Sequence, residues 1–203
     1  MWWKVKAFSA RVYYGYPASR LKIIGVTGTS GKTTTATLLY KIALGLEYKV
    51  GLISTVENLM NGESLGENSK GPGTTPDAVT LTKIFHTMYK AGCEYVIMEV
   101  SSHAVVQGRV DNIKFVGGIF TNLSQDHLDY HKDMEDYFQA KKRFFQMLPP
   151  RAFALTNTDD KYGARMIDGI HANPFTYGFV GDPNGVHFYG EVKKLDCNGI
   201  ELS

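Results

Sequence analysis

Cysteine is scarce in this chain of 203 residues. Cys93 and Cys197 are the two that occur, and they are far apart in the sequence. Their separation matches neither the closely spaced pairs of a zinc site nor the dense framework of a small disulfide-bonded domain. The sequence therefore predicts a protein of the reducing cytoplasm.

An excess of charge of one sign is also lacking. Lys and Arg number 22, Asp and Glu number 20, and the formal net charge is +2. The basic residues are scattered and never form a block, so the sequence favours no nucleic-acid partner. Internal repeats and low-complexity segments are absent as well. These features indicate an ordinary globular chain, and they do not predict an oligomeric state.

Long hydrophobic runs are missing, too. The first residues, MWWKVKAFSARVYYGYP, are aromatic and basic, without the continuous apolar stretch of a signal peptide or a membrane span. No membrane insertion is expected. Residues 1–20 form an N-terminal aromatic and basic segment, in which an amphipathic helix could lie on a membrane surface or dock against the protein; we expect docking. The apolar residues of this helix are Trp2, Trp3, Phe8, Val12 and Tyr13.

What the chain does have is an alternation of short apolar runs and helical patterns. The runs lack polar alternation, which is typical of parallel strands covered on both faces. From about Asn173 onward, Gly, Asp, Pro and Asn turns predict a small β appendage. The sequence thus predicts an α/β domain over residues 21–203, incomplete at its C-terminal end. Strands are expected at Leu21–Thr27, Val50–Thr55, Glu94–Val100, Phe115–Thr121 and Ala152–Thr156, and helices at Lys32–Leu44, Ala78–Lys90 and around Lys141.

The most specific motif is VTGTSGKTTT, which lies between the first strand and the first helix. In such a turn, backbone N–H groups converge on phosphate oxygens, Lys32 neutralises the phosphates and Thr33 can hold Mg²⁺. The strict pattern requires Gly where this chain has Val26, so the motif is a variant. The alternative is a tight turn without a ligand. We expect a P-loop NTPase-like fold whose nucleotide contacts are Gly28, Thr29, Ser30, Gly31, Lys32, Thr33 and Thr34.

Acidic and histidine residues follow two later strands. Glu99 ends EYVIME, where a carboxylate would lie beside the P-loop and anchor Mg²⁺; the alternative is an exposed residue at a strand end. The segment TNLSQDHLDYH contains Asp126, His127, Asp129 and His131. On a helix, the two histidines could bind zinc, but Asn122, Ser124 and Asp126 favour a loop. We expect His127 or its acidic neighbours to face the nucleotide, and His131 to be solvated or capping.

A lysine interrupts the apolar side of the helix in YFQAKKRFFQML. Advancing 100° per residue places Lys141 near the middle of a buried stripe. Its stem can pack while its ammonium reaches solvent at the rim, or it can be a buried functional amine. The residues of the stripe are Met134, Tyr137, Phe138, Lys141, Phe144, Phe145 and Leu148.

Five ordered segments resemble the central ATPase domain of Mur ligases of the MurE type: VTGTSGKTTT, GPGTTPD, MEVSSHAVVQGRV, FTNLSQDHLDYH and YFQAK. The resemblance covers about Leu21 to Asp160. Folylpolyglutamate synthases share the loop and the fold, but the later segments resemble the MurE type more. A non-catalytic nucleotide-binding remnant and a P-loop kinase or regulatory ATPase are the rival hypotheses.

The resemblance implies an ATP- and Mg²⁺-dependent ligase that adds the third amino acid to UDP-N-acetylmuramoyl-L-alanyl-D-glutamate through an acyl phosphate. It implies that CO₂ carbamylates Lys141, and burial supports this by favouring the neutral amine. For three of the substrate contacts there are structural alternatives: Thr74 and Thr75 could cap the helix that follows, and Arg109 could form a surface ion pair. The implied catalytic residues are Lys32, Glu99, His127 and Lys141, the metal ligands Thr33, Glu99, His127 and Lys141, and the substrate contacts Thr74, Thr75, Ser101, Gln107 and Arg109.

The chain departs from the family pattern in length. Mur ligases carry an N-terminal domain that binds the uridine nucleotide and a C-terminal domain that contacts adenine and the amino acid, and neither fits in this chain. We therefore expect the isolated chain to be inactive or nearly so, and the identity of the added amino acid not to be encoded in it.

Overall fold

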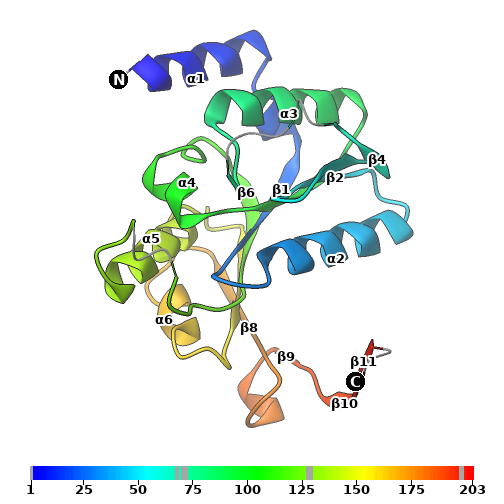
Figure 1. Cartoon of the computed structure of the whole chain (residues 1–203), viewed down its shortest axis with the longest axis vertical. Coiled ribbons are helices and arrows are strands. Elements are labelled where there is room, and N and C mark those ends of the chain that lie inside the picture. The colour runs from blue at the N-terminus through cyan, green and yellow to red at the C-terminus, as the bar shows by residue number, and fades with distance from the viewer. Residues whose placement is uncertain (1, 67–68, 70–72, 127–129, 197–198) are drawn as a thin grey trace.

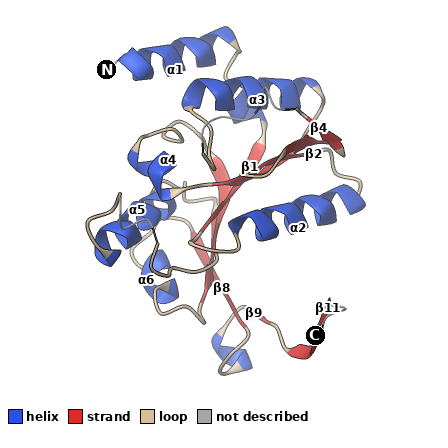
Figure 2. Cartoon of the chain, viewed as in Figure 1, coloured by secondary structure: helices blue, strands red, loops and turns tan. Residues whose placement is uncertain are grey.

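The computed structural model describes residues 2–66, 69, 73–126, 130–196 and 199–203. Nine strands form one sheet in the order β4-β3-β2-β5-β1-β6-β7-β8-β9 (Figures 1 and 2). All neighbours from β2 to β9 are parallel, whereas β2–β3 and β3–β4 are antiparallel. The strands are β1 (Lys22–Thr27), β2 (Val50–Ile53), β3 (Asn58–Met60), β4 (Glu63–Ser64), β5 (Tyr95–Glu99), β6 (Phe115–Phe120), β7 (Phe153–Asn157), β8 (Asn173–Gly178) and β9 (Phe188–Tyr189).

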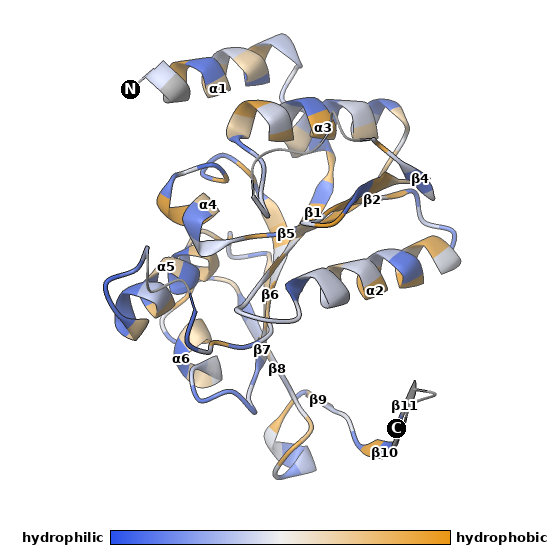
Figure 3. Ribbon diagram, viewed as in Figure 1, coloured by the Kyte–Doolittle hydropathy of each residue, from blue (hydrophilic) through white to orange (hydrophobic). Residues whose placement is uncertain are grey.

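Helices cover both faces of this sheet, so the predicted α/β fold with a mostly parallel sheet is confirmed. One core lies under α3, α4, α5 and α6, and a second lies under α2. Hydrophobic and hydrophilic segments alternate along the ribbons of α2 and α3 (Figure 3), as expected of helices that bury one side. The helices are α1 (Trp2–Tyr13), α2 (Lys32–Gly45), α3 (Ala78–Lys90), α4 (Ser102–Val106), α5 (Met134–Gln146) and α6 (Gly163–Ile167), with short 3-10 turns at Pro17–Arg20 and Pro183–Gly185.

Two glycines let α5 approach the centre of the sheet closely. A Cβ at Gly25 of β1 would lie 2.5 Å from Phe144 Cζ, and one at Gly118 of β6 would lie 2.9 Å from Phe144 Cε1. Phe144 of α5 is itself fully buried. Because Lys141 lies one turn before Phe144, this packing brings the lysine to the end of β1.

The C-terminal part differs from the expected appendage. The strand that begins at Asn173 is β8, which pairs with β7 in the main sheet, and β9 pairs with β8. The expectation that a separate β unit begins at Asn173 is therefore wrong. A small separate β unit does occur further along, where β10 (Val192–Asp196) and β11 (Gly199–Leu202) form a two-stranded antiparallel sheet.

The N-terminal segment forms the expected helix, and α1 packs on α3. The contact uses the buried Ala7 and the rings of Tyr14 and His86, whose centroids are 4.9 Å apart. Trp2 remains 79% exposed and Phe8 55%, so these aromatic residues do not make the docking contact. In the described part of the chain, the longest helix has 14 residues, and none is long and apolar enough to cross a bilayer.

Candidate nucleotide and substrate site

The P-loop motif forms the turn between β1 and α2. Gly28 and Gly31 have φ angles of 151° and 79°, which side chains other than glycine rarely adopt. A Cβ on Gly28 would also collide with Thr121 Oγ1. No described side chain caps the start of α2, whose N-cap is Gly31. The first N–H groups of α2 and the positive end of its dipole are therefore available to an anion.

A second segment fixes the loop from the neighbouring strand. Asn122 follows β6, and its backbone oxygen accepts from Thr29 N at 2.9 Å. Its amide exchanges two hydrogen bonds with Ser30, accepting from the backbone N and donating to the backbone O at 3.0 Å each. The sequence pattern predicted a loop at Asn122 but gave no sign of these hydrogen bonds. The adjacency of the ends of β1 and β6 could have indicated them.

Lys32, the first residue of α2, folds back over the loop. Its Nζ donates to Gly28 O at 2.9 Å and to Thr29 O at 2.8 Å. Burial lowers the pKa of Lys32, while the negative charges of Glu99 and Asp126 oppose that shift. In the register of the sheet, Glu99 at the end of β5 lies opposite Val26 of β1, so the end of β5 adjoins the P-loop, as predicted.

Lys141 is one of the largest fully buried side chains, with 1% of its surface exposed. Its Nζ donates to Gly28 O at 2.8 Å and lies 4.5 Å from the centre of the Tyr137 ring. Snorkelling to the rim is therefore wrong, and the buried amine is confirmed. Burial lowers the pKa of Lys141 well below its ordinary value, and the positive charge of Lys32 lowers it further, against an opposing effect of Asp126. The two lysines share one carbonyl oxygen as acceptor.

Glu99 is completely buried at the end of β5, so the alternative of an exposed residue is wrong. Its carboxylate accepts from Thr55 N at 2.8 Å and from Thr55 Oγ1 at 3.1 Å. Each oxygen accepts one of these bonds and keeps a lone pair for another partner. Thr55 follows β2, and the sequence interpretation did not single it out. Its place at the end of a strand was the available signal.

The predicted metal ligands lie partly within the described residues. Thr33 is half-buried in the first turn of α2, while His127 and Asp129 lie outside the described residues. Within the part of the chain that is described, no three His, Cys, Asp or Glu side chains form a cluster for a metal ion. The predicted set of Thr33, Glu99, His127 and Lys141 therefore stays a prediction.

A buried hydroxyl beside the loop fits an additional polar group there. Thr27 is 1% exposed, and its Oγ1 has no hydrogen-bond partner among the described residues. Alternation along β1 places Thr27 on the same face as Gly25, which contacts Phe144 of α5. Lys141 belongs to the same helix. A polar group added on this face, such as a carbamate oxygen or a metal-bound water, would satisfy the hydroxyl.

Four of the predicted substrate residues converge near the backbone of Glu99 and Ser101. Thr75 is buried, and its Oγ1 donates to Glu99 O at 3.0 Å and accepts from Ser101 N at 3.1 Å. Arg109 donates to Thr75 O at 2.6 Å, and its Nε and one terminal nitrogen clamp Gln107 Oε1 at 2.9 and 2.6 Å. The structure thus brings Thr75, Ser101, Gln107 and Arg109 together.

The residue that caps α3 is not one of the predicted substrate residues. Asp77 caps α3 by accepting from Val79 N and Thr80 N, so the alternative that Thr74 and Thr75 cap this helix is wrong. Thr74 is half-buried next to Thr75. Gln107 and Arg109 line a groove of about 580 Å³ between α1, the start of α3 and the end of α4. Its dimensions are sufficient for part of an extended ligand.

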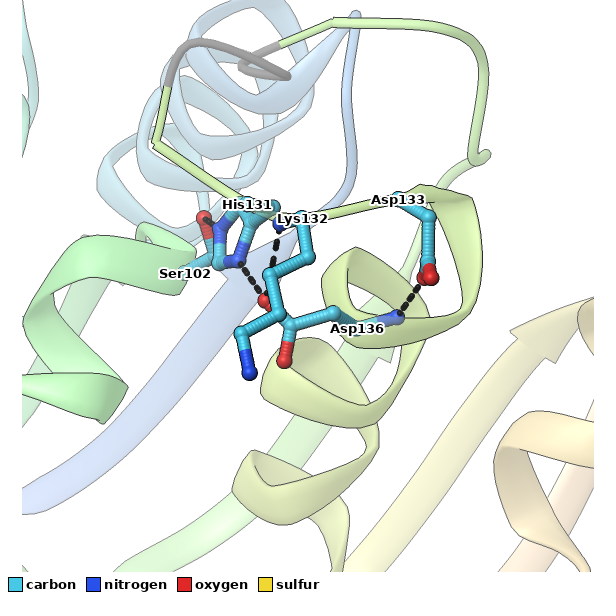
Figure 4. Close-up of polar contacts among 5 residues, drawn as sticks. All are labelled: Ser102, His131, Lys132, Asp133 and Asp136. Atoms are coloured by element: carbon cyan, nitrogen blue, oxygen red, sulfur yellow. Dashed lines mark hydrogen bonds and ion pairs between the residues drawn. The ribbon is translucent and has the colours of Figure 1, made fainter.

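His131 differs most from expectation. It is 2% exposed rather than solvated. Its Nε2 lies 3.0 Å from Ser102 Oγ in α4, and its Nδ1 lies 3.2 Å from Asp136 Oδ2 in α5 (Figure 4). The cap of α5 is instead Asp133, which accepts from Asp136 N. His131 therefore joins two helices.

Sequence comparison identifies the family to which this site belongs. The pattern of the Mur ligase middle domain matches residues 26–194. The chain belongs to the Mur ligase family. Members of this family use ATP and Mg²⁺, which agrees with the uncapped α2 and the buried carboxylate beside it.

Relatives within the Mur ligase family are similar over nearly the whole chain. Three examples are all named UDP-N-acetylmuramoyl-L-alanyl-D-glutamate–2,6-diaminopimelate ligase. The Parabacteroides distasonis protein is 52% identical over 196 residues, covering 94% of this chain and 39% of its own. Those of Bacteroides fragilis and Aquifex aeolicus are 47% and 44% identical, each covering 96% of this chain and respectively 40% and 38% of their own. The chain thus spans about 40% of the length of these relatives.

Solved structures show how widely the Mur ligase fold is shared. A structure of a ligase of the same name has a TM-score of 0.73 and 27% identity, covering 98% of this chain and 43% of its own. Mycobacterium tuberculosis folylpolyglutamate synthase in complex with ADP has a TM-score of 0.74 at 15% identity, covering 98% and 50%. The second likeness concerns the fold alone. Sequence identity, rather than fold, therefore favours the MurE type.

Proposed function

We propose that this chain is the ATP-binding middle domain of a ligase that adds 2,6-diaminopimelate to UDP-N-acetylmuramoyl-L-alanyl-D-glutamate in the cytoplasm. The names of relatives 44–52% identical support this substrate pair. Residues 21–203 belong to this domain, and the uridine and amino-acid contacts come from other domains of the ligase. Nucleic acid has no part in this function.

The observation that carries the proposal is the arrangement around Gly28. Two lysines from different helices, Lys32 and Lys141, donate to the same carbonyl oxygen. The buried Glu99 lies opposite Val26 in the sheet, directly before the P-loop. A site that combines an uncapped helix start, the cation of Lys32, a buried carboxylate and a second, buried amine suits a nucleoside triphosphate with its metal ion.

The reaction is phosphoryl transfer followed by amide formation. The γ-phosphoryl group of ATP passes to the substrate carboxylate, the incoming amine attacks the acyl phosphate, and phosphate leaves. Lys32 and the first N–H groups of α2 would hold the phosphates, and Glu99 and Thr33 would hold the metal ion. When bound, Mg²⁺ neutralises negative charge that develops on the transferred group. The residues around Arg109 orient the carboxylate, and Arg109 suits it because its planar fork can bind two oxygens.

Lys141 is proposed to act as a carbamate that joins His127 as a metal ligand. Carbamylation requires the neutral amine, and burial favours that form. The unpartnered hydroxyl of Thr27 offers one of the new oxygens a partner. Lys141→Arg keeps the charge but cannot be carbamylated in this way. We expect it to be as inactive as Lys141→Ala, with bicarbonate stimulating the wild type alone; full activity of the arginine variant would disprove the carbamate.

The proposed ligase activity is tested by product formation. A protein that carries this domain with the remaining ligase domains is given ATP, Mg²⁺, the UDP-muramoyl dipeptide and either 2,6-diaminopimelate or lysine. We expect the tripeptide product with diaminopimelate, dependent on Mg²⁺. A folylpolyglutamate synthase would instead extend a folate with glutamate. The 203-residue chain alone should give little or no product, and robust ligation by it would contradict the proposed division of domains.

A further inference from the structure

His131 lies between α4 and α5, two helices that border the site. Its ring nitrogens contact Ser102 of α4 and Asp136 of α5 (Figure 4). The face of its ring packs against Tyr137, with centroids 4.9 Å apart and planes inclined by 31°. A buried imidazole with both nitrogens engaged and a ring partner is held in one orientation.

The order of Ser102, His131 and Asp136 is that of a nucleophile, a base and an orienting carboxylate. However, Ser102 is only 2% exposed, and its helix packs into the main core. An acyl donor cannot reach a hydroxyl in this position. The arrangement therefore suits a structural connection rather than a nucleophile.

The hydrogen-bond network defines the tautomer of His131. The hydrogen bond from His131 lowers the pKa of Asp136, and the backbone N–H of Lys132 lowers it further. Asp136 is thus a carboxylate at neutral pH and accepts from His131 Nδ1–H. In the neutral ring, Nε2 is then the acceptor of the Ser102 hydroxyl. The carboxylate of Asp136 thus fixes His131 Nδ1 as the donor of one of the two hydrogen bonds.

The contacts of Tyr137 extend this junction to the nucleotide site. The Tyr137 hydroxyl lies 3.3 Å from Thr29 Oγ1 in the P-loop, and the ammonium of Lys141 lies over its ring. On the other side, Ser102 directly follows Ser101, the cap of α4 and a proposed substrate contact. His131 therefore contacts residues that adjoin both sides of the reaction.

We propose that His131 is a positioning residue that holds the start of α4 and the ring of Tyr137 together, and thereby couples the substrate side of the site to the P-loop. This proposal rests on the proposed function for its biological meaning. Its physical content, the coupling of α4 to the P-loop, is a property of the chain itself.

The first test uses the 203-residue chain and NMR spectroscopy. Long-range nitrogen–proton spectra of the imidazole should show that Nδ1 of His131 carries a proton, as its contact with the Asp136 carboxylate requires. Titration with Mg²⁺ and ADP should shift amide resonances of the P-loop and also those of α4, such as Ala104 and Val105. In His131→Phe, which keeps a ring against Tyr137 but loses both hydrogen bonds, the P-loop shifts should persist while the α4 shifts fall at least about threefold.

Controls separate coupling from folding. His171→Phe, an exchange at an exposed position, should leave the α4 response unchanged. Ser102→Ala removes one hydrogen bond and should reproduce the effect of His131→Phe if the latter variant does not fold. An undiminished α4 response in folded Ser102→Ala, or no α4 response in the wild type, would overturn the proposal.

Hydrogen exchange keeps this test independent of the proposed function. If the wild-type chain binds no nucleotide, the proposed function fails, but the role of His131 can still be measured. Protection of the Val105 amide, which donates to Ser101 O, should fall at least about tenfold in Ser102→Ala and stay unchanged in His171→Phe. Equal protection in all three proteins would show that His131 does not hold α4.

In the complete ligase, positioning predicts a change in kcat rather than in the KM for ATP. Displacement of reacting groups by about 1 Å can cost roughly 100-fold in rate. We expect kcat to fall at least about tenfold in His131→Phe and in Ser102→Ala. Because both variants break the same contact, kcat of the double variant should be little lower than that of either single variant. Asp136→Asn, which keeps an acceptor, should lose less than Asp136→Ala. Losses that only follow the folded fraction would contradict the proposal.

Discussion

The two helices that supply lysines to the site, α2 and α5, begin differently. α2 has Gly31 at its start, no side-chain cap and no acidic residue in its first turn. α5 is capped by Asp133 and carries Glu135 and Asp136 in its first turn. Both helices have a positive dipole end at the N-terminus, but only α5 has negatively charged residues of its own in that first turn.

This difference divides the work between the two helices. The first N–H groups of α2 are available to an external anion, and Lys32 lies among them. At α5 the N–H of Asp136 already donates to the Asp133 side chain. The contribution of α5 is instead a side chain from its second turn, Lys141, which reaches the same loop oxygen. The sequence thus provides a helix end for binding phosphate and a helix face for holding a buried amine.

Removing the cation at the start of α2 should have the largest effect. Lys32→Ala leaves the fold intact but removes the charge that faces the phosphates, so the affinity for ATP with Mg²⁺ should fall at least about 100-fold, which corresponds to roughly 2.7 kcal/mol. Calorimetry on the chain measures this. Lys41→Ala, an exposed exchange on the same helix, is the matched control. Equal affinity of Lys32→Ala and wild type would exclude a phosphate role for this turn.

Replacing the amine of α5 should separate stability from function. Lys141→Met replaces a buried polar amine with an apolar side chain, and Lys32 still donates to Gly28 O, so the free energy of unfolding should rise by about 1–2 kcal/mol. Ligation in the complete enzyme should disappear. Denaturant unfolding and product assays measure the two effects, with Lys142→Met, a neighbouring half-buried lysine, as the control. A stable, fully active Lys141→Met ligase would show that the amine has no chemical role.

Much of this arrangement was predictable because it depends on local patterns. The bounds expected for α3 are those observed, and α2 is one residue longer than expected. The stripe around Lys141 follows directly from helical geometry, and its buried members include Tyr137, Phe138, Phe144 and Phe145. Apolar strands, a glycine-rich turn and an amphipathic helix each leave a signature within a few residues.

The rest depends on contacts between distant segments. His131 is buried against Ser102, which lies 29 residues earlier in the sequence. No spacing rule predicts that pair. β8 joins the main sheet although Pro174 and the turn residues after it suggested an appendage. α4 and α6 have five residues each, too few to show a helical period. Thr55 contacts Glu99 because the ends of β2 and β5 are adjacent. Asn122 contacts the P-loop because the ends of β6 and β1 are adjacent.

Giving α2 an acidic residue like those of α5 should have an intermediate effect. Ser30 is exposed just before Gly31, so Ser30→Asp places a carboxylate at the open helix end, where it competes with phosphate. We expect the affinity for ATP to fall about tenfold, with little change in the free energy of unfolding. Calorimetry and melting curves provide the measurement. Ser30→Asn has similar size without charge and should bind nearly as well as wild type; an equal loss in both variants would assign the effect to shape.

The smallest effect concerns a capped helix, α3. Burial raises the pKa of Asp77, but the hydrogen bonds from the Thr80 side chain and from the N–H groups of Thr80 and Val79 outweigh burial and lower it. A carboxyl group whose pKa is lowered by folding stabilises the protein above its unfolded pKa of about 3.9, and this stabilisation is lost as the pH falls through the lower folded pKa. Asp77→Ala should therefore cost about 1 kcal/mol at pH 7, and the cost should shrink below about pH 4.

Asp77→Asn provides the matched control, because asparagine caps a helix but does not titrate. Its stability relative to Asp77→Ala should stay constant between pH 7 and pH 3, whereas that of the wild type should converge toward Asp77→Ala. Urea unfolding of the three proteins at several pH values measures the difference. Because α2 has no such cap, no exchange at Gly31 should produce an equivalent acid dependence. A cost of Asp77→Ala that does not vary with pH would mean that the hydrogen-bonding oxygen, and not its charge, stabilises α3, and the contrast with α2 would then be one of shape rather than of electrostatics.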